Sequence, residues 1–160
     1  MDYANIESPK AKEITEKLDE LLASYQVYCQ KLKAFHWNIK GKSFFELHAK
    51  FDELYQDAIV KIDELAERIL ILGFFPSYTL KEYLHKSALI EVSEIPLERK
   101  MINELLLDMN QLLKMEKECI KLATKHCDDG TIEMLRRYIS YKEKVCWMFI
   151  TWLKVDLTKK

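Results

Sequence analysis

Apolar residues recur every three or four positions along most of this chain, and that spacing places them on one face of a helix. The first segment shows the pattern clearly, with apolar side chains at Ile14, Leu18, Leu21, Leu22, Tyr25, Tyr28 and Leu32. Glycine and proline are rare, and they divide the chain into four segments of roughly 26 to 32 residues, which are too long to be ordinary strands. The pattern predicts four long helices, which run from Pro9 towards Gly41, from Ser43 to Gly73, from Pro96 to about Cys127 and from about Thr131 to Val155.

The residues at the segment boundaries are typical of helix ends. Pro9 suits the first turn of a helix, and Ser8 before it suits the N-cap. The sequences 43–46 and 79–82 both match a capping box, in which a hydroxyl and a glutamate three residues later satisfy free backbone N–H groups. Gly73 suits the C-terminal cap of the second helix.

The connections between the helices predict their arrangement. About four residues join the first helix to the second and the third to the fourth, so each of these pairs should be antiparallel. The middle connection has about 22 residues, and its capping box predicts a short helix from Thr79 through about Ala88. A connection of that length can cross the bundle and make the second and third helices parallel. The sequence therefore predicts an all-α, ferritin-like four-helix bundle with one long crossover, formed by residues 1–160 as a single domain with short tails at 1–8 and 156–160.

Composition excludes several classes of protein. The 25 Lys+Arg and 26 Asp+Glu residues leave a formal net charge of −1, so the chain lacks the basic excess of a dedicated nucleic-acid binder. No apolar run is long enough to span a membrane, and residues 1–7 lack the features of a secretory signal, so we expect a cytoplasmic protein. The four cysteines match no common zinc spacing, and we expect reduced thiols packed as small hydrophobic groups: Cys29, Cys119, Cys127 and Cys146.

Candidate chemistry is concentrated between residues 36 and 67. His48 and Asp52 are four residues apart, as are Asp63 and Glu67, so each pair lies one turn apart on one helix face. At about 100° per residue, all four side chains fall within a stripe about 100° wide. His36 lies near the end of the first helix, and the short turn that follows should fold it back beside His48.

The two pairs on the second helix cannot bind one ion within a single chain. Asp52 and Asp63 are about 16 Å apart along the helix axis, whereas metal–ligand bonds are about 2 Å long. If the second helix packs antiparallel on its own copy, with a two-fold axis near Asp57 or Ala58, the histidine end of one chain meets the carboxylate end of the other. Two identical sites about 22 Å apart would result. Imidazole and carboxylate ligands together suit a divalent cation that changes its oxidation state, such as iron.

The same region resembles the Dps family, the mini-ferritins or DNA-binding proteins from starved cells. The resemblance is carried by Phe35-His36-Trp37-Asn38-Ile39-x-Gly41, Phe45, Leu47-His48, Phe51-Asp52-Glu53-Leu54-Tyr55, Asp63-x-x-Ala66-Glu67-Arg68-Ile69 and Leu72-Gly73. The spacing H-x11-H-x3-D-x10-D-x3-E within it is highly specific. Later parts of the chain are also similar to the family, namely Asp128-Asp129-Gly130-Thr131 and Trp147-Met148.

The resemblance implies a ferroxidase and iron-storage protein. Such a protein is a hollow dodecamer that oxidises Fe(II), preferably with hydrogen peroxide, and holds the ferric mineral inside, which limits Fenton damage. The resemblance places two irons at each two-fold interface, with His36, His48 and Asp52 from one subunit and Asp63 and Glu67 from its partner. Asp63 and Glu67 would be the strongest ligands, with Glu67 bridging to the second iron. His36 would complete the first iron site, and His48 and Asp52 would form the weaker second one.

For several other residues the sequence leaves two possible roles open. Trp37 would either quench oxidising equivalents beside His36 or only pack at the helix end. Asp128 and Asp129 would either line an acidic pore that guides ferrous ions inward or cap the last helix. Three further carboxylates of the second helix would either face a cavity and nucleate mineral or simply be solvated: Glu53, Asp57 and Glu64.

Direct DNA binding is not expected, although the family name mentions it. Residues 1–8 contain no basic residue, and the other end carries only Lys154, Lys159 and Lys160. Twelve copies could sum to a weak, salt-sensitive and sequence-independent attachment at most. Two rival hypotheses follow: a cage that mainly coats DNA, and a scaffold whose sites hold a redox-silent divalent metal such as zinc.

Overall fold

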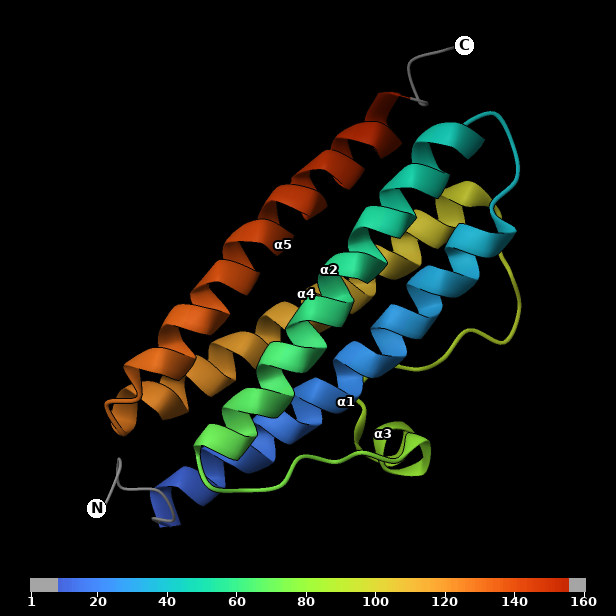
Figure 1. Ribbon diagram of the computed structural model, residues 1–160. Helices are drawn as coiled ribbons and strands as arrows, with labels where there is room; N and C mark the ends of the chain where they lie inside the picture. The colour runs from blue at the N-terminus through green and yellow to red at the C-terminus, as the bar shows by residue number, and fades with distance from the viewer. Residues whose placement is uncertain (1–8, 156–160) are drawn as a thin grey trace.

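The computed structural model describes residues 9–155, which form five helices and, within that range, no strand (Figure 1). The helices are α1 (Pro9–Asn38), α2 (Phe44–Ile71), α3 (Leu80–Lys86), α4 (Glu98–Lys125) and α5 (Asp129–Val155). In Figure 1 the four long helices lie alongside one another, and α2 and α4 run in the same direction because the crossover returns along the bundle. The predicted ferritin-like bundle with one long crossover is confirmed. The predicted tails and the Ser8 cap lie outside the described residues.

The helix ends agree with the sequence predictions at two positions. Gly73 has a φ of +86°, and its N–H donates to the carbonyl of Leu70 while the next N–H, that of Phe74, donates to Ile69. This pair of bonds is the Schellman cap, whose left-handed residue is usually glycine. The capping box of α3 is also present, because Thr79 and Glu82 bond each other's backbone N–H groups.

Three predicted helix ends were wrong in detail. Ser43 precedes α2 but makes no capping hydrogen bond through its side chain, since its φ of −95° and ψ of 21° are not extended. The short helix α3 ends at Lys86, two residues before Ala88. Helix α4 begins at Glu98 rather than at Pro96, because the preceding residue, Leu97, is still extended.

The crossover is attached to α1 through a buried carboxylate. Asp19 accepts hydrogen bonds from the backbone N–H and the hydroxyl of Ser77, both at 2.7 Å, and from the ammonium of Lys86 at 2.5 Å. Burial alone would raise the pKa of Asp19, but the hydrogen bonds from Lys86 and Ser77 outweigh it and hold the pKa below its ordinary value. These contacts keep α3 packed against α1.

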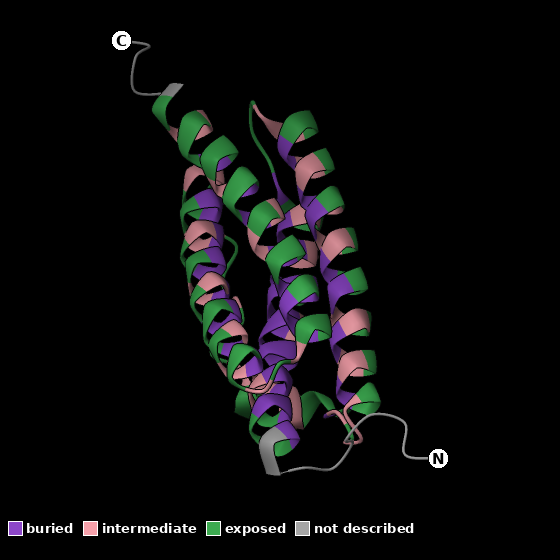
Figure 2. Cartoon of the chain, turned by 90° about the vertical axis from the view of Figure 1, so that its left-hand side faces the viewer, coloured by how far each residue is buried: buried purple, intermediate pink, exposed green. Residues whose placement is uncertain are grey.

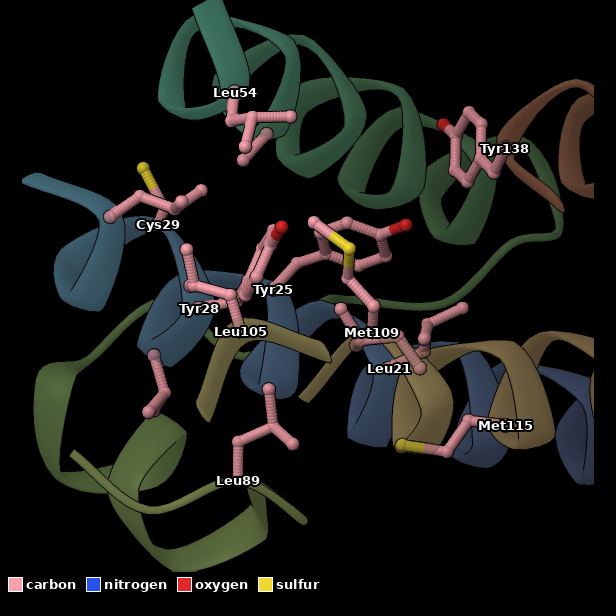
Figure 3. Close-up of a cluster of buried hydrophobic side chains, with 14 of the residues drawn as sticks. Leu21, Tyr25, Tyr28, Cys29, Leu54, Leu89, Leu105, Met109, Met115 and Tyr138 are labelled. Atoms are coloured by element: carbon pink, nitrogen blue, oxygen red, sulfur yellow. The ribbon is translucent and has the colours of Figure 1, made fainter. Parts of the chain in front are cut away.

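The core is apolar over most of its length but contains a cluster of charged and polar side chains. In Figure 2 the buried residues follow the inward faces of the helices, and Figure 3 shows members of the core from all four long helices, including Leu21, Leu54, Met109 and Tyr138. At its centre the Tyr25 hydroxyl donates to Glu116 at 2.5 Å, and the Lys142 ammonium donates to both at 2.6 and 2.9 Å. Burial, reinforced by the Glu116 charge, raises the pKa of Tyr25 well above its ordinary value.

The cysteines and the surface complete the comparison with the sequence. All four thiols are free, and Cys29 and Cys119 are buried as predicted, whereas Cys127 is exposed and so does not pack as a hydrophobic group. Burial raises the pKa of Cys119 to about 12, which keeps that thiol protonated. No helix in residues 9–155 combines the length and apolar character that a membrane crossing requires.

Candidate metal centre

The hairpin of α1 and α2 brings two of the predicted ligands, His36 and His48, together at one end of the bundle. Phe35 of α1 and Phe51 of α2 are fully buried, and their ring centroids are 6.0 Å apart. Their contact sets the register of the two helices. Gly41 in the turn has a φ of +123°, a region that side-chain-bearing residues rarely adopt, so glycine is needed where the chain reverses. The next helix then starts beside the end of α1.

The two histidines of the hairpin bond each other's backbone. Nδ1 of His36 is 2.8 Å from the carbonyl oxygen of His48, and Nδ1 of His48 is 2.9 Å from the carbonyl oxygen of His36. A carbonyl oxygen only accepts, so each Nδ1 must carry the hydrogen. The rings stack with centroids 3.9 Å apart and planes 19° apart. In neutral imidazoles both Nε2 atoms then keep a lone pair, which is the tautomer that binds a metal.

Asp52 lies one turn after His48 on α2, and Tyr55 follows it three residues later. The interaction with the Asp52 carboxylate is the main reason why the pKa of the Tyr55 hydroxyl is raised. The Tyr55 ring also meets the ring of His36 edge-on, with centroids 5.4 Å apart. The structure therefore brings His36 and His48 together, and Asp52 as a third ligand beside them stays a prediction.

Asp63 and Glu67 lie further along α2, and both are exposed. Neither has a hydrogen-bond or ion-pair partner among the described residues. Within residues 9–155 of one chain, no group of three or more His, Cys, Asp and Glu side chains is placed to hold a metal ion. A site shared between two chains requires that Asp63 and Glu67 lie apart from the histidines of their own chain. The pairing of two chains along α2 stays a prediction.

The outward face of α2 mixes these polar side chains with apolar ones. At about 100° per residue, the buried residues of α2 lie roughly opposite the stripe that contains the predicted ligands. Near the level predicted for the two-fold axis, Ala58 faces the core and Asp57 pairs with Lys61. The exposed apolar side chains there are Ile59 and Val60, with 40% and 57% of their surface accessible. Exposed apolar residues in line with the ligands are typical of a protein–protein interface.

Comparison with known proteins identifies the family. Residues 15–157 match the model of the ferritin-like domain. A Bacillus anthracis protein named DNA protection during starvation protein 2 is 36% identical over 142 residues, which cover 89% of this chain and 97% of that one. The chain belongs to the Dps family of the ferritin-like superfamily. The Vibrio cholerae Dps crystal structure, described as a ferritin-like diiron-carboxylate protein, has a TM-score of 0.89 and 36% identity, and the match covers 95% of this chain and 99% of that one. The Staphylococcus aureus Dps structure has a TM-score of 0.86, 36% identity, and coverage of 89% and 95%.

In this Dps-family chain, Asp128 caps helix α5. Its carboxylate accepts from the backbone N–H of Thr131 at 3.0 Å and from the Thr131 hydroxyl at 2.5 Å, and it also pairs with Arg68. Capping is therefore the interpretation that the structure supports for Asp128. Asp129 is exposed in the first turn of α5, so a role in an iron-entry pore stays a prediction for that residue alone.

Arg68 is a contributing residue that sequence reasoning did not single out. Its guanidinium bonds Asp128 and Thr131 across the bundle and lies over Gly130, where an added Cβ would come within 2.9 Å of it. Arg68 thereby ties the end of α2, which carries Glu67, to the start of α5. In the sequence, only its position next to Glu67 in the family motif could have pointed to this role of Arg68.

The three further carboxylates of α2 have partners. Tyr141 donates to Glu53 at 2.9 Å, Tyr138 donates to Glu64 at 2.5 Å, and Asp57 pairs with Lys61. Glu53 and Glu64 therefore connect α2 to α5, so solvation alone does not describe them. A role in mineral nucleation stays a prediction.

Trp37 is 64% exposed, and the described part of the chain contains no aromatic contact to its ring. Packing at the helix end within its own chain is therefore not supported.

Proposed function

We propose that this chain assembles into a dodecameric cage that oxidises Fe(II), preferably with hydrogen peroxide, and retains the ferric product inside. The observation that carries the proposal is the paired imidazoles of His36 and His48. Their reciprocal hydrogen bonds leave both Nε2 atoms available, and His48 lies on the face of α2 that also carries Asp52, Asp63 and Glu67. Relatives described as Dps and as diiron-carboxylate proteins support it.

Each site would receive two irons as substrates. His36, His48 and Asp52 of one subunit would face Asp63 and Glu67 of its partner across the two-fold axis, with Glu67 bridging the irons. Carboxylate oxygens stabilise the extra charge of ferric iron, so oxidation is favoured where Asp63 and Glu67 bind. A cytoplasmic location, and weak DNA attachment at most, stay predictions.

The test follows iron oxidation optically after anaerobic loading with two Fe(II) per expected site. Limiting peroxide should oxidise the iron rapidly and air slowly, with the iron co-eluting with a large assembly. Glu67→Gln should slow the fast phase by more than about tenfold, since even partners of metal ligands cost that much when removed. Glu118→Gln, at an exposed position of α4, is the matched control and should behave as the unaltered protein. Equal, slow oxidation by both oxidants with no retained iron would contradict the proposal.

A redox-silent site is the second candidate, and the paired imidazoles favour it because they also suit zinc. Metal analysis of the purified protein distinguishes the two. If the protein holds stoichiometric zinc that Fe(II) does not displace, and does not oxidise Fe(II), the scaffold hypothesis is supported and the ferroxidase proposal is refuted.

A further inference from the structure

His126 is the C-cap residue of helix α4, and its imidazole has no hydrogen-bond partner. The side chain is 17% exposed, and both ring nitrogens are buried without a donor or acceptor among the described residues. Buried polar atoms nearly always have such a partner, so an exception calls for a cause such as a bound ion. The imidazole of His126 is therefore a candidate ligand.

Glu13 of α1 supplies an acidic group beside this ring. Its Oε2 lies 3.7 Å from Nε2 of His126, and its side chain is 56% exposed. That separation is longer than a hydrogen bond, so a neutral imidazole and the carboxylate do not satisfy each other. It does suit two ligands of one metal ion. With bonds of about 2.1 Å to each atom, the ion would see the two ligands at an angle of about 120°, close to a tetrahedral or trigonal arrangement.

We propose that His126 and Glu13 bind a divalent transition-metal ion through Nε2 and a carboxylate oxygen. An imidazole and a carboxylate together suit ions such as Zn²⁺ and Fe²⁺. Within residues 9–155, no third His, Cys, Asp or Glu side chain is placed to complete such a site, so water reaching the exposed side of Glu13 would supply the remaining ligands. Structural zinc sites have four protein ligands and hold their ion permanently, whereas this site would exchange it.

The site is separate from the candidate metal centre of the same chain. Glu13 and His36 both lie on α1, about 35 Å apart along its axis. The ion would join the start of α1 to the turn between α4 and α5, which lie at the same end of the bundle (Figure 1). Asp129 begins α5 at that turn, so the site would hold a divalent cation at the end of the bundle that carries this carboxylate. The inference does not depend on the proposed ferroxidase function.

The test uses zinc alone as the probe, because zinc has no redox chemistry. The assembly is stripped of metal with a chelator, dialysed against zinc and analysed for zinc per chain. His126→Gln and Glu13→Gln should each bind about one zinc per chain fewer than the unaltered protein. The matched control is His85→Gln, which alters an exposed histidine of α3 and should bind as much zinc as the unaltered protein.

Two further measurements locate the ion. Crystals soaked in zinc should show an anomalous-scattering peak between Nε2 of His126 and Oε2 of Glu13. Zinc should also raise the Tm less in Glu13→Gln than in the unaltered protein, because an ion that binds the folded state stabilises it.

Zinc stoichiometry that is unchanged in either variant, or crystals without a peak between the two atoms, would overturn the site. If His126→Gln does not assemble, Glu13→Gln decides alone, because its side chain is largely exposed and its substitution leaves the packing of the core unchanged.

Discussion

A site shared between two subunits can be tested by combining two chains with complementary defects. One chain carries Asp63→Asn and Glu67→Gln, and the other carries His36→Gln and His48→Gln. Each set removes the ligands that one subunit contributes to a shared site. Either chain alone should therefore form assemblies without fast iron oxidation. Together they should recover part of it, because a mixed pair can build a complete site from the two unaltered halves.

The expected recovery follows from two-fold symmetry. Equal amounts of the two chains pair at random, so half of the pairs are mixed. In a mixed pair one site has all its ligands and the other lacks both halves, so about one quarter of all sites are intact. The fast phase of peroxide-driven oxidation should therefore reach about one quarter of its amplitude in the unaltered protein, with an unchanged rate.

The substitutions should leave the fold intact, so lost activity reports on the site. Asp63 and Glu67 are exposed without a polar partner among the described residues, and such surface changes are usually within about 0.5 kcal/mol. The hydrogen bonds made by His36 and His48 contribute about 1 kcal/mol each, and a glutamine amide can donate to the same carbonyl oxygens. Thermal unfolding of each parent assembly checks this.

The assay co-expresses the chains with two different affinity tags, purifies the mixed assemblies through both, and measures stopped-flow absorbance after anaerobic loading. Tandem purification proves that mixed pairs exist and gives their proportion. If such assemblies show no fast phase, the ligands do not combine across the interface and the reasoning from helix spacing is refuted. A fast phase in either parent alone would show that oxidation does not need the ligands removed from that parent, and it would refute their assignment.

Two stability predictions follow from the core and the crossover. Lys142→Met should destabilise the protein by about 3–5 kcal/mol in denaturant unfolding, because it leaves the Glu116 carboxylate buried without its counter-charge. Adding Glu116→Gln to this variant should restore much of the lost stability. A double variant that is as unstable as Lys142→Met alone would contradict this explanation. Asp19→Asn should destabilise the protein at neutral pH but progressively less below about pH 4. The folded-state pKa of Asp19 is lowered, so its contribution is present above the unfolded-state value of about 3.9 and is lost as the pH falls through the folded-state pKa. A difference between Asp19→Asn and the unaltered protein that does not change across pH 2 to 7 would show that the charge on Asp19 is not the cause.

The helices were predictable from the sequence where local chemistry alone decides their ends. The capping box at Thr79 formed because an extended residue there lets its hydroxyl reach the N–H of Glu82. The sequence at Ser43 matches the capping-box pattern equally well, but no capping hydrogen bond forms from its side chain. Ser43 lies in the tight turn between α1 and α2, and the turn imposes a backbone conformation that keeps the hydroxyl from the helix N-terminus. Packing of the hairpin overrides the local preference at that position.

Residue spacing predicted part of the candidate site, namely which residues share a helix face, but it did not predict the contacts between helices. Helical periodicity assigns His48, Asp52, Asp63 and Glu67 to one face, because all four lie on one rigid element. Periodicity says nothing about contacts between elements. The reciprocal bonds to His36 depend on the register of two helices, and the choice of Asp128 as a cap depends on Arg68, sixty positions earlier in the chain.

On the outward face of α2, the residue spacing along the helix and the contacts between helices bear on the same site. Ile59 and Val60 are exposed next to each other on the side of α2 that carries Asp63 and Glu67, whose carboxylates have no polar partner among residues 9–155. Two-fold pairing along this side of α2 would cover the apolar side chains and complete the ligand set in one step. The same contact that stabilises a dimer would then create the reactive site, so an isolated chain should bind iron weakly and oxidise it slowly. Charged substitution at Ile59 should therefore weaken assembly and ferroxidase activity together, although Ile59 contributes no ligand.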